Sequence, residues 1–110
     1  MVLDYVLTKP PYHGGIIIKH EGTDLSARWA PIPILSFAKV LKEVADTIKD
    51  VGSIGYEFPG SDATLDFLYQ NGDVTISASY NSGAIIHVPY VELLAAIDEF
   101  YRSATRNLAS

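Results

Sequence analysis

Three side chains of the kind that form hydrolytic triads fall on one face of neighbouring predicted strands. If the last three strands pair as their turns predict, Asp66 lies opposite Ser77, and Ser77 lies opposite His87. A catalytic relay needs the histidine between the serine and the carboxylate, because the imidazole takes the serine proton while the carboxylate orients it. Here the serine occupies the middle strand, and the sequence lacks the Gly-x-Ser-x-Gly elbow that presents a nucleophilic serine. The arrangement therefore argues against a hydrolase.

The chain also lacks the residue patterns that hold a metal or a cofactor. It contains no cysteine, which excludes disulfides, thiolate metal sites and a cysteine nucleophile. Its histidines, His13, His20 and His87, lack the His-x-x-x-His spacing of a zinc site, and no acidic ligand spacing accompanies them. Gly14-Gly15 precedes a predicted strand and not a helix, so it forms no phosphate-cradling loop. We therefore predict a protein that is not an enzyme and that has no metal or cofactor.

The elements that position these residues are clearest in the second half of the chain. Residues 64–70 and 73–80 alternate between apolar and polar side chains, and they are separated by Asn71-Gly72, the pair favoured in a two-residue type I′ turn. This turn sets the register and places the large apolar side chains on one face. Asn81-Ser82-Gly83 then predicts a three-residue loop into a third strand over residues 84–88.

The same patterns give the remaining elements. Further strands are predicted over residues 2–8, 16–20, 24–30 and 53–58. A helix with apolar residues every three or four positions is predicted from Ser36, as its N-cap, to Gly52, as its stop. A second helix is predicted to begin at Pro89 or Tyr90. The order βββ-α-ββββ-α predicts an α+β fold with a mainly antiparallel sheet and two helices packed on one face.

Length and composition predict one folded domain. The chain of 110 residues suits a single domain spanning residues 1–110, and we find no internal repeat or linker within it. Hydrophobic residues make up 48% of the chain and charged residues 19%, which is sufficient apolar content for a packed core and argues against disorder. The chain shows no signal-peptide pattern and no apolar run long enough to span a bilayer, so the cytoplasm is the expected location.

Charge narrows the choice of partner. Thirteen acidic residues against eight basic ones give a formal net charge of −5, which repels phosphate backbones and anionic lipid headgroups. We therefore expect no direct contact with nucleic acid or membranes, whereas a basic protein would be attracted. Acidic composition also keeps small domains soluble, so the charge alone does not establish a function.

The surface that remains for a contact is the uncovered face of the predicted sheet and its margin. This surface mixes small polar, acidic and aliphatic side chains. The candidate partner-binding residues are Glu57, Asp62, Asp66, Ser77, Ile85 and His87. Such a mixture suits a protein interface, but it also occurs on solvated sheet faces, so both interpretations stay open.

Several short segments resemble a group of short bacterial domains. These segments are Ser26-Ala-Arg-Trp29 with Pro31-Ile-Pro33, Tyr56-Glu-Phe-Pro59 with Ser61-Asp-Ala63, Ile76-Ser-Ala-Ser-Tyr80, and Val88-Pro89. Small acidic domains of this type are often immunity proteins of polymorphic or contact-dependent toxin systems. The resemblance implies a protein that binds and neutralises a cognate toxin, and a nuclease is the first candidate because nuclease surfaces are basic. The alternative is a non-catalytic structural or self-associating accessory domain that forms a weak homodimer through its open sheet face or an edge strand.

Overall fold

The predicted order of strands and helices is confirmed in a computed structural model, which describes residues 1–108. The strands are β1 (Val2–Lys9), β2 (His13–His20), β3 (Thr23–Asp24), β4 (Ala27–Pro33), β5 (Ser53–Glu57), β6 (Thr64–Gln70), β7 (Asp73–Ala78) and β8 (Ile85–Pro89). The helices are α1 (Ile34–Val51) and α2 (Tyr90–Leu108). The fold is α+β and antiparallel, as predicted, and its strands are divided between two sheets. Within residues 1–108, neither helix is long and apolar enough to cross a membrane.

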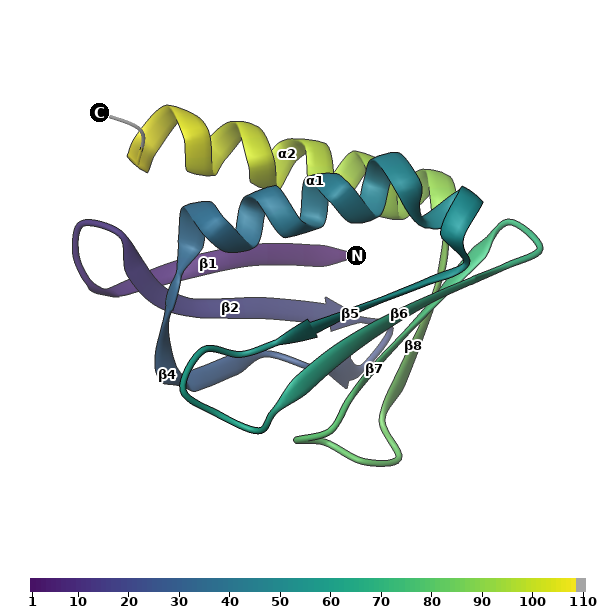
Figure 1. Cartoon of the computed structure of the whole chain (residues 1–110), viewed down its shortest axis with the longest axis horizontal. Coiled ribbons are helices and arrows are strands. Elements are labelled where there is room, and N and C mark those ends of the chain that lie inside the picture. The colour runs from purple at the N-terminus through teal and green to yellow at the C-terminus, as the bar shows by residue number, and fades with distance from the viewer. Residues whose placement is uncertain (109–110) are drawn as a thin grey trace.

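Each sheet contains four strands and is antiparallel throughout. In sheet A (β1–β4), β2 is central, with β1 on one side and the successive strands β3 and β4 on the other. Sheet B (β5–β8) is a meander in which each strand pairs with the next. The two helices lie side by side along one side of the molecule, with the strands of both sheets beneath them (Figure 1). Helix α1 carries the chain from β4, the last strand of sheet A, to β5, the first strand of sheet B.

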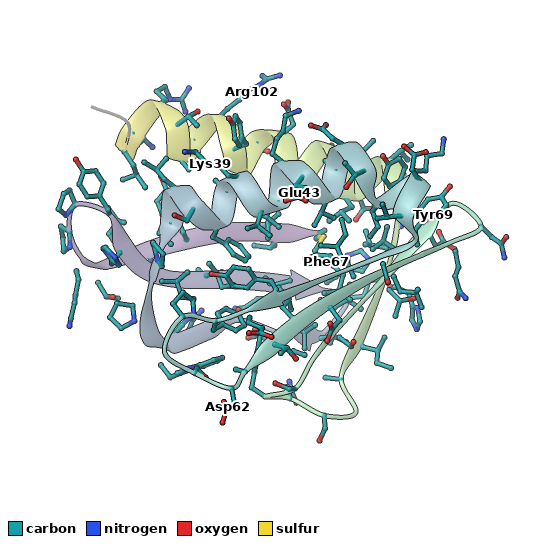
Figure 2. The ribbon with its side chains drawn as sticks, in the orientation of Figure 1. Lys39, Glu43, Asp62, Phe67, Tyr69 and Arg102 are labelled. Carbon is teal, nitrogen blue, oxygen red and sulfur yellow. The ribbon has the colours of Figure 1, made fainter. Side chains whose placement is uncertain are left out.

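Apolar side chains from both sheets and both helices form one core. Alternation along β6 buries Leu65 and Phe67 and exposes Asp66, and Figure 2 shows Phe67 and Tyr69 below the helices. Aromatic rings continue through this core in edge-to-face contacts with centroids 4.6–5.9 Å apart. The rings belong to Tyr5, Trp29, Phe37, Tyr56, Phe58, Tyr80 and Phe100. Phe100 of α2 is only 3% exposed.

The hairpin predicted from Asn71-Gly72 is confirmed residue by residue. Asn71 has φ 52° and Gly72 has φ 85°, the positive values that a type I′ turn requires. Gln70 consequently lies opposite Asp73, and β6 and β7 pair without a register shift from there onward. A local turn signal was sufficient here because the turn itself determines the register of both strands.

The predicted register of the next strand pair is wrong by two residues. We predicted that Ser77 would lie opposite His87, whereas the structure places Ile85 opposite Ser77 and Thr75 opposite His87. The predicted faces remain correct, because a shift of two residues returns each side chain to the same side of the sheet. The predicted row of aspartate, serine and histidine therefore does not exist.

The register differs because the loop between β7 and β8 is longer than predicted and is held by sheet A. The loop covers residues 79–84. The hydroxyl group of Tyr80 donates a hydrogen bond of 2.6 Å to the backbone oxygen of Leu25, and the Asn81 side-chain amide donates one of 3.0 Å to the backbone oxygen of Asp24. These contacts pull the chain out of the strand before the predicted turn, and the short-range sequence pattern does not contain them.

The predicted N-cap of the first helix is also wrong. The N-cap position is Pro33 and not Ser36, and no side chain caps the helix. The backbone N–H group of Ile34 instead donates to the backbone oxygen of Tyr12, at 2.9 Å. A tertiary backbone contact thus satisfies one of the free donors at the start of the helix. The end of the helix is as predicted, with Gly52 as the C-cap at φ 87°.

The strand predicted over residues 24–30 is interrupted. The Ser26 hydroxyl oxygen accepts the backbone N–H group of Ile18 at 3.0 Å, which replaces a strand partner and separates β3 from β4. Alternation along residues 24–30 predicts that Trp29 shares the buried face of Leu25 and Ala27, but Trp29 is 50% exposed. Its ring packs edge-to-face against Phe58 and Tyr80 with centroids 5.5 Å and 4.6 Å away, so the indole is held in place while one part of it stays in contact with water.

Candidate protein-binding face

The predicted contact residues lie mainly on the exposed face of sheet B, which we call the outer face. It is formed by Ser53, Gly55, Glu57, Thr64, Asp66, Leu68, Thr75, Ser77, Ile85 and His87. Five of the six candidates are among these residues. The sixth, Asp62, lies in the loop between β5 and β6, and Figure 2 shows it pointing away from the body of the molecule.

Polar contacts on the outer face are few and local. Asp66 lies between Gly55 of β5 and Ser77 of β7, as predicted for the serine. Thr75 Oγ1 lies 3.2 Å from His87 Nδ1, so the imidazole of His87 has a threonine beside it and not a serine. A hydroxyl group that contacts the ring without a carboxylate behind the ring does not reproduce a catalytic relay.

Gly55 makes room for the carboxylate of Asp66. A Cβ atom placed on Gly55 would lie 2.9 Å from Asp66 Oδ1, so the carboxylate lies over the glycine backbone. Its other oxygen, Oδ2, accepts a hydrogen bond of 3.5 Å from the Thr64 hydroxyl group, which is at the limit of useful length. The carboxylate is exposed and is held by one weak contact, so it is available to a group from outside.

Charge is distributed unequally along the chain. Residues 53–89, which include all of sheet B, contain four carboxylates and no lysine or arginine. Residues 1–52 contain six acidic and six basic residues, so they carry no net charge. The four carboxylates belong to Glu57, Asp62, Asp66 and Asp73, and all four residues are exposed. In the part of the chain that the structure describes, none of them has an ion-pair partner.

Two aliphatic side chains accompany this charge. Leu68 is 40% exposed and Ile85 is 46% exposed, and both lie on the outer face. Single exposed apolar residues are normal on protein surfaces. Their position among uncompensated carboxylates nevertheless gives the face both kinds of group that protein interfaces use.

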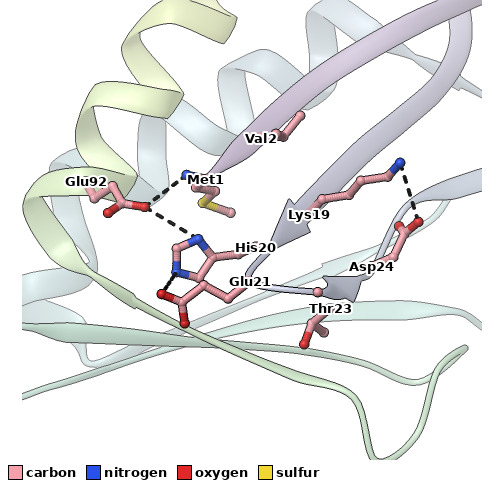
Figure 3. Close-up of a pocket in the computed structure, with 9 residues that line it drawn as sticks. Met1, Val2, Lys19, His20, Glu21, Thr23, Asp24 and Glu92 are labelled. Atoms are coloured by element: carbon pink, nitrogen blue, oxygen red, sulfur yellow. Dashed lines mark hydrogen bonds and ion pairs between the residues drawn. The ribbon is translucent and has the colours of Figure 1, made fainter.

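A shallow cleft at one end of sheet A is lined by several charged side chains of both signs. It has a volume of about 640 Å³ and lies where β1 begins, β2 ends and α2 begins (Figure 3). His20 Nδ1 lies 3.5 Å from Glu92 Oε2, and the same oxygen accepts a hydrogen bond of 3.0 Å from the Met1 ammonium group. This hydrogen bond, the charge of the ammonium group and the charge of His20 hold the pKa of Glu92 below its ordinary value.

The sequence did not indicate this cleft. His20 has the isolated spacing of a surface histidine, and its carboxylate partner comes from a helix late in the chain. The charges of the cleft pair with one another: Lys19 Nζ lies 3.9 Å from Asp24 Oδ2, and His20 Nε2 lies 3.9 Å from Glu21 Oε1. Across residues 1–108, no group of three histidine, aspartate or glutamate side chains is arranged to hold a metal ion. The arrangement joins three elements of the fold, and each charged group that lines the cleft lies within 4 Å of a group of opposite sign.

The two clusters of charge therefore differ in what they leave open. The cleft contains both signs of charge in contact, whereas the outer face carries one sign without a partner. An uncompensated field of one sign attracts partners of the opposite sign. No protein-family model, curated protein or solved structure matches this chain.

Proposed function

We propose that the protein is an immunity protein that uses the outer face of sheet B to bind and neutralise a basic toxin. One observation carries the proposal. Residues 53–89, which include all of sheet B, contain four carboxylates and no lysine or arginine, while the rest of the chain is nearly neutral. Complementary charge across an interface accelerates encounter and selects the partner. A nuclease is the preferred toxin class, because a surface that binds phosphate backbones is basic.

The proposed mode of action is stoichiometric contact without catalysis. Leu68 and Ile85 supply apolar area, and Asp66 and Glu57 supply charge on the same face. Apolar contacts at the centre of an interface, with charged groups around them, are the usual arrangement in stable complexes. The proposed location is the cytoplasm of the producing cell, where the protein would meet an incoming or newly made toxin.

The test is co-expression with the polypeptide encoded by the adjacent gene. The proposal expects protection of the host cell and a complex that copurifies with one copy of each chain. A double variant, Glu57→Lys with Asp66→Lys, is expected to abolish both, because it places positive charge against a basic partner. The matched control, Glu43→Lys with Glu99→Lys, makes the same change in charge on the helices and is expected to protect as the wild type does. Absence of protection and of a complex with the wild-type chain would refute the proposal.

Self-association is the second candidate, and the exposure of Leu68 and Ile85 on a flat face is the observation in its favour. Such a face could pair with a second copy of itself about a two-fold axis. The same axis would bring the carboxylates of both copies together, which opposes the contact. Light scattering over a range of concentrations separates the two candidates: a mass that stays at one chain excludes the accessory-dimer function.

A further inference from the structure

The free edges of the two sheets are protected to different extents. A strand at the edge of a sheet presents unpaired backbone groups, and proteins usually block them with proline, charge, bulges or a covering element. In sheet A the edge strands are β1 on one side and β3 followed by β4 on the other, and in sheet B they are β5 and β8. The hydrogen bonds that flank each ladder determine which residues of an edge strand point outward, because these bonds alternate along an antiparallel pair.

Each of the three edges other than that of β5 carries at least one feature that hinders the addition of a strand. On β1, the outward N–H group of Tyr5 is taken by the Asp4 carboxylate at 2.8 Å. On β4, the two residues that flank Ile32 point outward, because Ile32 faces β2. Both are prolines, Pro31 and Pro33, and proline has no N–H group to donate. On β8, Pro89 has no outward N–H group, and the strand lies close to β2 of sheet A, whereas the N–H groups of Ile85 and His87 point outward by the same alternation.

The edge of β5 is not blocked. Tyr69 N–H donates to the Gly52 oxygen at 2.8 Å at one end of the β5–β6 ladder, and Phe58 N–H donates to the Ala63 oxygen at 3.0 Å at the other. By alternation, the backbone groups of Ser53, Gly55 and Glu57 point away from β6. The strand contains no proline and no bulge, and all three residues are exposed. Because Gly55 has no side chain, its exposure is exposure of the backbone.

Side chains on the inner side of β5 are also incompletely covered. Ile54 and Tyr56 face the core but are only half-buried, whereas their partners on β6, Phe67 and Leu65, are buried. An additional strand beside β5 would cover the open flank of both side chains. One neighbouring strand would therefore both pair the free backbone groups of this edge and cover its apolar side chains.

We propose that β5 accepts an extended segment of the partner protein as a fifth strand of sheet B. The segment would carry lysine or arginine at alternate positions. Backbone hydrogen bonds would supply affinity, and the side chains at alternate positions would supply selectivity. Next to Gly55 the incoming side chain meets no Cβ atom and reaches the Asp66 carboxylate directly, and Glu57 receives the next one. This inference deepens the proposed function and rests on it for the identity of the partner.

Charge also argues that the occupant is not a second copy of this chain. If two β5 strands paired antiparallel about Gly55, the Asp66 carboxylates of both copies would lie near each other over the paired glycines. Each Glu57 would add a further negative charge at the ends. Like charges in adjacent positions on a sheet destabilise the pairing, whereas a basic strand would compensate both Asp66 and Glu57 of the one chain that it joins.

The probe for the first experiment is a short synthetic peptide that alternates lysine with valine. Amide hydrogen exchange is followed by NMR on the wild-type protein with increasing peptide. Slower exchange is expected for the N–H groups of Ser53, Gly55 and Glu57, and none for those of Ile85 and His87 on β8. A peptide that alternates glutamate with valine is expected to give no protection. Unchanged exchange along β5 with saturating lysine peptide, or equal protection on β8, would overturn the proposal.

Two substitutions at one position separate the contribution of the backbone N–H group to peptide binding from the effect of an added side chain. Gly55→Pro and Gly55→Ala both place a Cβ atom near Asp66, but only proline removes the outward N–H group. Gly55→Pro is expected to weaken peptide binding about tenfold more than Gly55→Ala does. Far-UV circular dichroism verifies that each variant folds, and the exchange experiment on the wild type decides the matter if the proline variant does not. Equal affinities of two folded variants would contradict strand addition.

A charge variant and a partner experiment complete the test. Asp66→Asn is expected to weaken binding of the lysine peptide several-fold, whereas Asp98→Asn on α2 is expected to leave it unchanged. In co-expression, a Gly55→Pro chain that still neutralises the toxin, in a complex that leaves the β5 amides exposed, would refute strand addition while the proposed function stands. Protection of β5 by the peptide without any toxin complex would leave strand addition standing and refute the proposed function.

Discussion

Sheets A and B have the same number of strands and share one core, but they differ in how their surfaces are completed. On sheet A, Lys19 lies beside Asp24 and prolines occupy one edge. On sheet B, the carboxylates have no positive neighbour within the described residues, and the edge of β5 is bare. Uncompensated like charge and open strand edges both carry a cost to an isolated protein. Sheet A is therefore completed by its own chain, whereas sheet B has the features of a surface that another chain completes.

The largest expected effect concerns whether two such different sheets still fold as one unit. Phe37 on α1 is fully buried, and its ring contacts Tyr56 of sheet B and Phe100 of α2 at 5.1 Å and 5.9 Å. Phe37→Ala is expected to lower the free energy of unfolding by about 3–5 kcal/mol. Urea denaturation should show one transition, at the same midpoint by circular dichroism and by the fluorescence of Trp29, the single tryptophan.

Phe37→Leu is the control for that prediction, because it keeps most of the buried volume and should cost clearly less. Separate transitions by the two probes would mean that the sheets are independent. The comparison between them would then concern two folding units and not two surfaces of one domain.

A matched pair of glycine substitutions should show that sheet B tolerates an added Cβ atom better than sheet A does. On sheet A, a Cβ atom at Gly14 would overlap the Val6 carbonyl oxygen and lie 2.8 Å from Leu7 Cα. These are backbone atoms of β1, so Gly14→Ala is expected to cost about 1–3 kcal/mol. On sheet B, Gly55→Ala meets only the Asp66 carboxylate, which can turn away, and should change stability by less than about 1 kcal/mol. Thermal and urea denaturation of both variants measure the difference, and equal losses would contradict it.

The sequence predicted those features of the fold that depend on neighbouring residues. Asn71-Gly72 gave the register of β6 and β7 because the turn requires positive φ at both positions. Gly52 ended the first helix for the same kind of reason. The faces of sheet B followed from alternation, and with them the exposure of Asp66 and Ile85. What could be predicted was local geometry.

The features that the sequence did not predict depend on contacts between distant segments. The register of β8 differs from the prediction because Tyr80 bonds to the Leu25 oxygen. The start of α1 differs because Ile34 bonds to the Tyr12 oxygen. The unpaired edge of β5 cannot be predicted from the sequence, because it depends on which backbone groups of β5 point away from β6 and on the partial exposure of Tyr56. The absence of basic residues from residues 53–89 was readable in the sequence, but its meaning depends on these residues forming one sheet.

The next prediction concerns the bond that joins the two sheets at the β7–β8 loop. The Tyr80 hydroxyl group donates to the Leu25 oxygen at 2.6 Å, across the boundary between sheets B and A. Tyr80→Phe keeps the ring contacts with Trp29 and Phe58 but removes this bond. The expected loss in the free energy of unfolding is about 0.5–1.5 kcal/mol, measured by urea denaturation at neutral pH. A loss near zero would mean that ring packing alone positions the loop.

Alkaline pH gives an independent measure of the same group. Burial, together with the charge of Asp24, raises the pKa of Tyr80 above its ordinary value. The unfolded chain therefore releases this proton at a lower pH than the folded one does, and stability falls as pH rises above the ordinary tyrosine pKa. Tyr80→Phe should make that decline less steep, although Tyr56, whose pKa is also raised by burial, should preserve part of it.

The smallest effect is expected at acidic pH, from the paired charges of sheet A. Hydrogen bonds from Ser26, first from its side chain and then from its backbone N–H group, hold the pKa of Asp24 below its ordinary value. The charges of Lys19 and Arg28 lower the pKa of this carboxyl further. Because the folded-state pKa is the lower one, this carboxylate stabilises the fold fully above its unfolded pKa, and the contribution is lost as pH falls through the folded value.

Asp24→Asn should therefore make the loss of stability between neutral pH and pH 3 less steep, as measured by urea denaturation at each pH. Ser26→Ala should also flatten the slope, because it removes the hydrogen bond that lowers the pKa most. It should lower stability at every pH as well, since the Ser26 hydroxyl oxygen also accepts the Ile18 N–H group. The slope and the offset thus separate the charge of Asp24 from the packing around it. An unchanged slope in both variants would mean that the paired charges of sheet A do not stabilise it. Sheets A and B would then not differ in the contribution of charge to stability.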